Sequence, residues 1–177
     1  ILIGLVGSEM CIRDSIKTAQ KVGYDMEVLQ AVESVNEKQK SILFNKLMKH
    51  FNGDIKGKTI AIWGLAFKPE TDDMREAPAL VLIDKIISVG ASVKVYDPIA
   101  MPECKRRIGD KVVYCKDMYE AVVNVDTLLL VTEWKEFRMP NLEVLNKTMK
   151  NKVIIDGRNI YDAKEMVESG FDYYKIG

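Results

Sequence analysis

The chain of 177 residues is long enough for one full domain with an additional segment. Its 26 basic and 26 acidic side chains balance, so the charge does not indicate a protein that binds nucleic acid or an anionic membrane. One histidine and three cysteines without metal-ligand spacing argue against a zinc site, and no stretch is apolar enough to cross a membrane, so we expect a cytoplasmic protein with reduced thiols.

Residues 1–15 begin without Met and show no clear hydrophobic period. We interpret this segment as a foreign junction, such as a remnant of cloning, and leave it out of the fold prediction. We therefore expect the chain to be both truncated and modified at its start.

Residues 16–56 are predicted to be a mainly helical region. Its apolar residues mostly recur at steps of three and four: Val28, Leu29, Val32, Val35, Ile42, Leu43, Leu47 and Met48. Asp25 is a candidate N-cap and Gly53 a candidate stop signal, and a helix from Asp25 to Phe51 would be about 40 Å long. That length fits either a linker helix beneath one domain or a longer helix that also pairs two copies of the chain.

From residue 57 onward, strands and helices alternate, which predicts a parallel sheet with helices on both faces. The expected strands are Thr59–Trp63, Ser92–Tyr96, Lys111–Tyr114, Thr127–Val131, Lys152–Ile155 and Asp172–Ile176. The expected helices are Pro78–Val89, Met101–Arg107, Met118–Asn124, Asn141–Met149 and Ala163–Ser169. We predict an α/β fold, a Rossmann-like, doubly wound, six-stranded sheet of order 3-2-1-4-5-6, preceded by the long helix. The third strand and the polar helix before it fit the pattern least.

A charged loop joins the first predicted strand to its helix. It is not a dinucleotide fingerprint, because Ala66 and Pro69 stand where G-x-G-x-x-G requires glycine. The loop instead carries Lys68 and Arg75 among acidic residues, and it is either a solvated loop or a binding loop. We expect its aspartates, Asp72 and Asp73, to order the loop rather than to perform chemistry.

The predicted topology brings three separate segments to one edge of the sheet. The carboxyl ends of strands 1, 4 and 5 lead to Phe67-Lys68, Thr132-Glu133-Trp134 and Gly157-Arg158. Two cations and two aromatic rings suit a nucleoside diphosphate, although each of these residues alone is also explained as a solvated charge or a packing residue. Asp97 ends strand 2, where a dinucleotide fold keeps its ribose-binding acid, but Pro98 follows it and we interpret Asp97 as a turn-former.

The motif G-L-A-F-K-P-x-T-D-D-x-R-x-x-P at 64–78 closely resembles the signature that opens the C-terminal domain of the UDP-glucose and GDP-mannose dehydrogenases. The resemblance continues through V-Y-D-P at 95–98, T-E-W-K-E-F-R at 132–138 and I-D-G-R-N at 155–159, and covers the chain from about residue 16 to its end. Among the subfamilies, the chain is most similar to the UDP-glucose 6-dehydrogenases.

The resemblance implies an NAD-dependent enzyme that oxidises UDP-glucose to UDP-glucuronate with two NAD, of which residues 57–177 form the UDP-sugar-binding domain. Phe67, Lys68 and Arg158 would bind the substrate, and Arg75 would reach NAD held by an N-terminal domain. It also implies a homodimer formed through residues 25–51.

No catalytic residue is assigned within this chain. The family's nucleophile lies in a G-x-C-[FL]-P-K-D context, which the surroundings of Cys11 do not match, so we expect the chain alone to be inactive. A GDP-mannose or UDP-N-acetylmannosamine dehydrogenase fragment and a stand-alone nucleotide-binding or regulatory module remain alternatives.

Overall fold

The structure, a computed structural model, describes residues 8–176, with side chains described at position 12 and from position 14 onward. It divides the chain into two compact units, Ile1–Lys40 and Ser41–Gly177. Residues 1–7 of the segment interpreted as a foreign junction and the side chain of Cys11 lie outside the described residues. The proposed domain ranges, 1–15, 16–56 and 57–177, stay a prediction.

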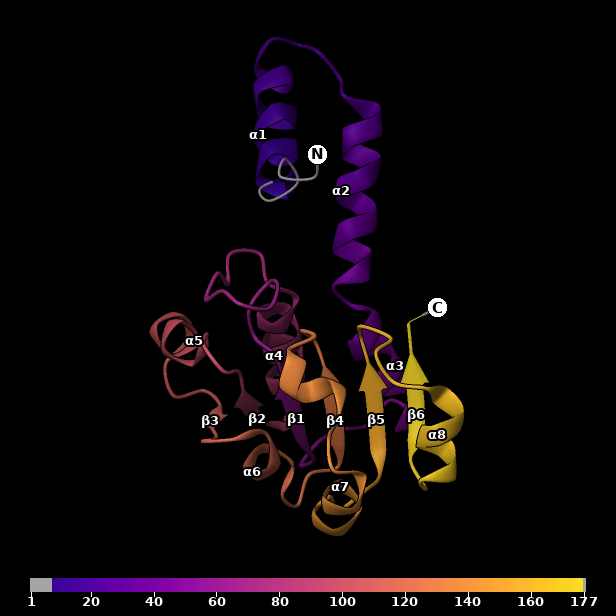
Figure 1. The fold of residues 1–177 in the computed structure, drawn as a ribbon. Coiled ribbons are helices and arrows are strands. Elements are labelled where there is room, and N and C mark those ends of the chain that lie inside the picture. The colour runs from indigo at the N-terminus through magenta and orange to yellow at the C-terminus, as the bar shows by residue number, and fades with distance from the viewer. Residues whose placement is uncertain (1–7, 177) are drawn as a thin grey trace. The chain divides into compact units, whose positions relative to one another are not determined.

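The first unit is a hairpin of two helices, α1 (Ser8–Lys21) and α2 (Glu27–Gln39), which lie side by side (Figure 1). The turn between them closes with a hydrogen bond from the Tyr24 N–H to the carbonyl of Ala19, and Gly23 there has a φ of +74°. Ile16 of α1 is buried, whereas α2 has no buried side chain. The valines of α2 are consequently exposed.

The single helix predicted from Asp25 to Phe51 is wrong, because α2 ends at Gln39 and a separate helix, α3, spans Ile42–His50. Ser41, which precedes α3, is tied to the rest of the second unit, since its hydroxyl accepts a hydrogen bond from Lys85 Nζ at 2.6 Å. Leu43 and Leu47 of α3 are buried in the core of that unit. Tertiary packing thus ends a helix that the hydrophobic period would continue.

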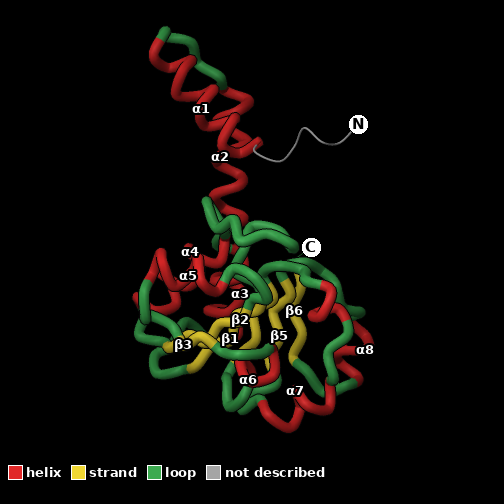
Figure 2. The backbone as a smooth tube through the Cα atoms, turned by 60° about the vertical axis from the view of Figure 1, so that its left-hand side comes forward, coloured by secondary structure: helices red, strands yellow, loops and turns green. Residues whose placement is uncertain are grey.

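The second unit is built on a parallel sheet of six strands in the order β3-β2-β1-β4-β5-β6 (Figure 2). The strands are β1 (Thr59–Trp63), β2 (Ser92–Tyr96), β3 (Val113–Tyr114), β4 (Thr127–Leu130), β5 (Val153–Asp156) and β6 (Asp172–Lys175). The predicted α/β fold and strand order are confirmed. The third strand lies at one edge of the sheet and has only two residues, of which Val113 is exposed.

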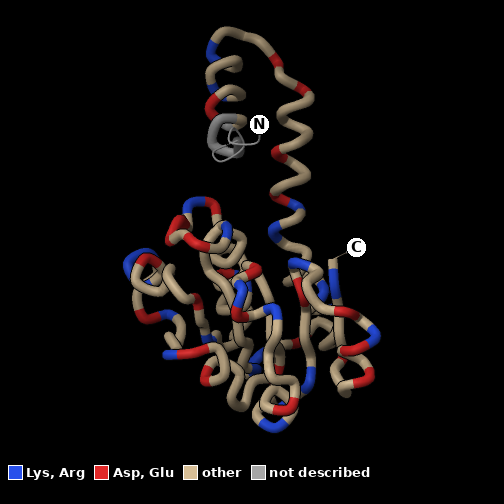
Figure 3. Tube along the Cα trace, viewed as in Figure 1, with Lys and Arg blue, Asp and Glu red and all other residues tan. Residues whose placement is uncertain are grey.

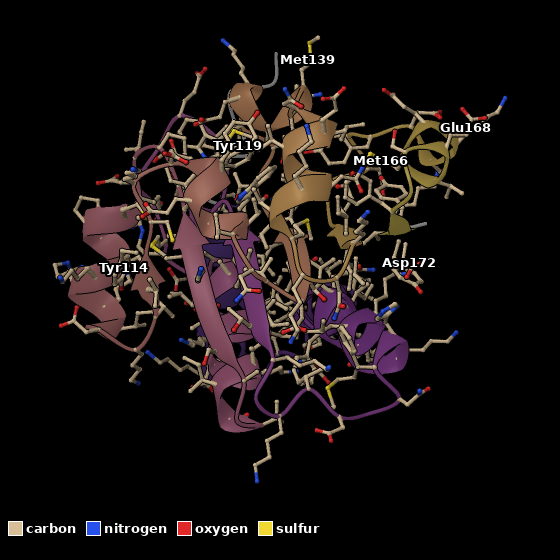
Figure 4. All side chains as sticks on the ribbon, turned by 90° about the horizontal axis from the view of Figure 1, so that it is seen from below. Tyr114, Tyr119, Met139, Met166, Glu168 and Asp172 are labelled. Carbon is tan, nitrogen blue, oxygen red and sulfur yellow. The ribbon has the colours of Figure 1, made fainter. Side chains whose placement is uncertain are left out.

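Alternate residues of the central strands face two separate cores. Ile60 and Ile62 of β1 pack with α3, α4 (Pro78–Ser88) and α5 (Met101–Ile108), whereas Ala61 and Trp63 pack with α6 (Met118–Val122), α7 (Leu142–Thr148) and α8 (Ala163–Glu168). Met166 of α8 lies in this second core (Figure 4). Strands buried on both faces read as continuous apolar runs, which is why the sequence predicted them well.

In the view of Figure 3, positions with charges of both signs are interspersed along the second unit. Of the helices in the described part of the chain, none has both the length and the apolar character that crossing a membrane requires.

Candidate functional site

The loop that follows β1 turns sharply at Gly64. This residue has a φ of +87°, and a Cβ atom placed on it would lie 2.5 Å from Cβ and 2.6 Å from the backbone N of Thr132. Its N–H donates to the carbonyl of Tyr96 at 2.9 Å. Only glycine fits both the left-handed conformation and this close approach of the two chain segments.

Phe67 and Lys68 follow on the surface side of this loop. Phe67 is 37% exposed, and its N–H donates to the carbonyl of Asp73 at 2.9 Å, which closes the loop on itself. Lys68 is half-buried, and within the described residues its ammonium group makes no hydrogen bond or ion pair. An exposed ring and a cation without a protein partner among the described residues therefore follow one another in the loop at this edge of the sheet, and both are available to a ligand.

Arg158 joins the carboxyl ends of β1, β4 and β5. Its Nε donates to the carbonyl of Val131 at 2.7 Å, and its Nη2 donates to the carbonyl of Phe67 at 3.3 Å. The carboxylate of Glu133 lies 2.9 Å from Nε as an ion pair. The structure thus brings Arg158 and the Phe67 backbone together, as the predicted topology requires.

The loop that carries Arg158 is ordered by Asp156, the last residue of β5, which is fully buried. One oxygen accepts from the N–H of Arg158 at 2.7 Å, and the other accepts from the N–H of Ile160 at 2.8 Å and the hydroxyl of Tyr173 at 2.8 Å. Gly157, between them, leaves no room for a side chain, because a Cβ atom there would lie 2.7 Å from the carbonyl oxygen of Leu130.

Arg75 lies further along the same loop and is paired with Asp73. Its Nε and Nη2 donate to the two carboxylate oxygens at 3.0 and 2.8 Å, and its N–H also donates to Asp73 at 3.0 Å. These hydrogen bonds lower the pKa of Asp73 to about 2. The prediction that an aspartate orders the loop is confirmed for Asp73. Among the described residues, the guanidinium of Arg75 is bonded to Asp73, whereas that of Arg158 is bonded to the carbonyls of Val131 and Phe67, so the two arginines have different partners.

Asp97 is 1% exposed, and its Oδ1 accepts from the N–H groups of Ile99 and Ala100 at 2.9 and 2.7 Å. This pattern confirms Asp97 as a turn-former. Since its other oxygen is also bonded inward, to the loop after β1, the carboxylate is not available to a ribose.

Trp134, whose ring is predicted to face a ligand, is only 7% exposed, and its indole N–H donates to Asp97 at 3.1 Å. Trp134 also lines an open hollow of about 470 Å³ between the loops after β1, β2 and β4. Tyr96 and Glu136 lie near this hollow, where desolvation and the carboxylate of Glu136 raise the pKa of Tyr96 to about 12. The mixed charges there do not select an anionic nucleotide.

Two residues important for this geometry are not among the predicted site residues. Glu133 and Asp156 each contact Arg158. The Asp156 contact is an Asx-turn to the N–H two residues on, which an Asp before a Gly can indicate, whereas no local pattern indicates the Glu133 contact. The described residues contain no group of His, Cys, Asp and Glu side chains arranged to hold a metal ion. Cys104 and Cys115 are buried, and burial raises the pKa of both thiols, so neither resembles an activated nucleophile.

A family model and curated relatives both relate this chain to the same family of dehydrogenases. Residues 61–163 match the family model described as "UDP-glucose/GDP-mannose dehydrogenase family, UDP binding domain". The chain is 42% identical over 171 residues to a UDP-glucose 6-dehydrogenase of Pseudomonas aeruginosa and 41% identical over 162 residues to UDP-glucose 6-dehydrogenase TuaD of Bacillus subtilis. These alignments include 94% and 92% of this chain but only 38% and 35% of the two relatives.

Among solved structures, the chain resembles a UDP-glucose dehydrogenase from Pyrobaculum islandicum. The TM-score is 0.77 at 28% sequence identity, and the match covers 91% of this chain and 34% of the other. The similarity therefore extends over nearly the whole chain, which corresponds to about a third of the longer protein.

Proposed function

The chain belongs to the UDP-glucose/GDP-mannose dehydrogenase family, and we propose that its second unit binds the nucleotide part of a UDP-sugar through Phe67, Lys68 and Arg158. The observation that carries this proposal is the hydrogen bond from Arg158 to the carbonyl of Phe67 at the carboxyl edge of the sheet, directly before Lys68, whose ammonium group lacks a protein partner among the described residues. Ligands of open α/β sheets bind at this edge.

Each of the three residues offers a different interaction. Arg158 commits Nε and one N–H of Nη2 to backbone carbonyls, so the N–H groups of Nη1 are left for a phosphate or the edge of a base. Lys68 supplies a point charge suited to a diphosphate, and Phe67 supplies an exposed ring for stacking. Together these groups favour an anionic ligand that also carries a planar base.

For the whole enzyme we propose the oxidation of UDP-glucose to UDP-glucuronate with two NAD. Two relatives that carry the name UDP-glucose 6-dehydrogenase support this choice of substrate. The family branch that acts on GDP-mannose would instead bind GDP more tightly than UDP, so a competition titration between the two nucleotides separates them.

The described residues do not form a dinucleotide site. The loop after β1 lacks the fingerprint glycines, and both carboxylate oxygens of Asp97 are committed to internal hydrogen bonds. We therefore propose that this chain alone forms no NADH from UDP-glucose and NAD, and that Arg75 provides one contact to a cofactor held elsewhere in the whole enzyme. Arg75 would share its guanidinium between that cofactor and Asp73.

We also propose that two copies of the chain associate through residues 25–51. Val28, Val32 and Val35 of α2 are 76%, 39% and 53% exposed, and such a row of valines on one helix is a candidate interface. A symmetric pairing would remove these side chains from water.

The experiment that tests the nucleotide site is a calorimetric titration of UDP into the chain and into two variants of Arg158. Removing one charge-assisted hydrogen bond should cost about 1.5–3 kcal/mol, so Arg158→Ala should weaken UDP binding by roughly ten- to hundredfold. Arg158→Lys should recover only part of this affinity, since lysine does not reproduce the fork of the guanidinium. Unchanged UDP affinity in Arg158→Ala would refute the assignment.

A further inference from the structure

We propose that Asp97 and Trp134 are positioning residues that fix the backbone of the Phe67–Lys68 segment in its binding conformation. The proposal rests on the proposed nucleotide site and adds to it two residues that do not touch the ligand. It gives the acid at the end of β2 a role different from the ribose contact that this position has in dinucleotide-binding sheets.

The geometry that carries the proposal centres on Asp97 Oδ2. This oxygen accepts hydrogen bonds from the N–H of Leu65 at 2.7 Å, the N–H of Ala66 at 3.3 Å and the indole Nε1 of Trp134 at 3.1 Å. One buried carboxylate thereby ties together the segments that follow β1, β2 and β4. Its other oxygen is held by two backbone N–H groups of its own turn, so the carboxylate has no freedom to rotate.

The two amides that Asp97 holds lie directly before the binding segment. Leu65 and Ala66 are both fully buried, and the carbonyl of Ala66 accepts a further hydrogen bond from the hydroxyl of Thr132 at 2.6 Å. The peptide groups on both sides of Ala66 are therefore held by hydrogen bonds, which fixes the direction in which the backbone continues to Phe67. The carbonyl of Phe67 accepts a hydrogen bond from Arg158, so a rotation of the peptide planes at residues 65 and 66 would displace both the Phe67–Lys68 segment and Arg158.

Trp134 provides the best variant, because Trp134→Phe removes one donor from Asp97 and keeps most of the ring. Asp97→Asn is a poorer choice, since an amide NH₂ would face N–H donors whichever way it turned. The chain also offers a matched control in its second tryptophan, Trp63, which is fully buried and whose Nε1 donates to the carbonyl of Met118 at 3.0 Å. Trp63→Phe also removes one buried indole hydrogen bond, but that bond does not involve Asp97.

The test measures UDP affinity and amide hydrogen exchange at Leu65 and Ala66 in the full 177-residue chain, at a temperature below the melting transitions of both variants. Trp134→Phe should weaken UDP binding and accelerate exchange at these two amides, each by roughly tenfold, the lower end for removal of a hydrogen bond to a charged group. Trp63→Phe should lower the melting temperature but leave UDP affinity within about twofold of the parent chain.

The two readouts separate this inference from the proposed function. If the parent chain does not bind UDP, the proposed function fails, and exchange at Leu65 and Ala66 alone decides whether Trp134 and Asp97 hold the segment. If the parent chain binds UDP and Trp134→Phe matches it in affinity and in exchange, the positioning role is overturned. Equal reductions of affinity in the two tryptophan variants would also overturn it, because they would show a general effect of stability.

Discussion

Replacing Gly64 by Ala should destabilise the second unit far more than the same replacement at an open glycine. Gly53 is the matched control, because its φ of +88° is nearly that of Gly64, +87°, and no atom lies within 4 Å of the position that a Cβ atom would take there. At Gly64 the added methyl group would lie 2.5 Å from the Cβ of Thr132. The two variants thus share the backbone strain and differ in the steric clash.

The expected magnitudes follow from these two contributions. A left-handed conformation costs a residue with a Cβ atom about 1–2 kcal/mol, and this cost applies to both variants. Forcing an extra methyl group into a packed position costs about 1–3 kcal/mol more. Gly53→Ala should therefore lower the free energy of unfolding by about 1–2 kcal/mol, and Gly64→Ala by about 2–5 kcal/mol.

Urea denaturation followed by tryptophan fluorescence measures this difference. Both tryptophans, Trp63 and Trp134, lie in the second unit, so the signal reports on that unit and not on the α1–α2 hairpin. For a slope of about 2 kcal/mol per molar urea, a clash of about 2 kcal/mol lowers the midpoint by about 1 M below that of Gly53→Ala. Equal midpoints for the two variants would refute the close packing of Gly64 against Thr132.

Three further predictions concern other parts of the chain. The Asp73 pKa of about 2 lies below its ordinary 3.8, so the pair with Arg75 stabilises the loop above about pH 4, and this stabilisation is lost as the pH falls through 2. In Arg75→Ala, the titration midpoint of the Asp73 carboxyl carbon, followed by NMR, should rise toward 3.8, and an unchanged midpoint would contradict the pairing. In a Cys11→Ser background, the buried Cys104 and Cys115 should react with Ellman's reagent much more slowly in the native chain than in urea, whereas equal rates would contradict their burial. Val28→Glu with Val35→Glu should convert a sedimenting dimer to a monomer, and a parent chain that is already monomeric at high micromolar concentration would count against the α2 interface.

The strands were predictable from two patterns: β1, β4 and β5 are buried on both faces, and β2 alternates between buried and more exposed residues. Runs such as Thr59–Trp63 and Ser92–Tyr96 are bounded by polar turns, and the structure reproduces both ranges without change. The strand order then placed the ends of β1, β4 and β5 at one edge, which is why the sequence predicts Phe67 and Arg158 to be neighbours.

The break at Lys40–Ser41 and the internal contacts of the site were not predictable in the same way. The hydrophobic period runs across the break, and only packing of Leu43 and Leu47 on the second unit distinguishes α3 from α2. The contact of Glu133 with Arg158 joins residues far apart in the sequence, so no local pattern indicates it. The inward bonds of Asp97 to the loop after β1 are of the same kind.

The measurement that tests the central claim most directly is the affinity for UDP of Lys68→Ala compared with Lys135→Ala. Both variants remove one positive charge near the carboxyl edge of the sheet, but Lys135 is 92% exposed and already paired with Glu70. Lys68→Ala should weaken UDP binding by roughly ten- to hundredfold, while Lys135→Ala should change it by less than about twofold. Equal affinities of the parent chain and Lys68→Ala for UDP would contradict the proposal that this loop binds the nucleotide.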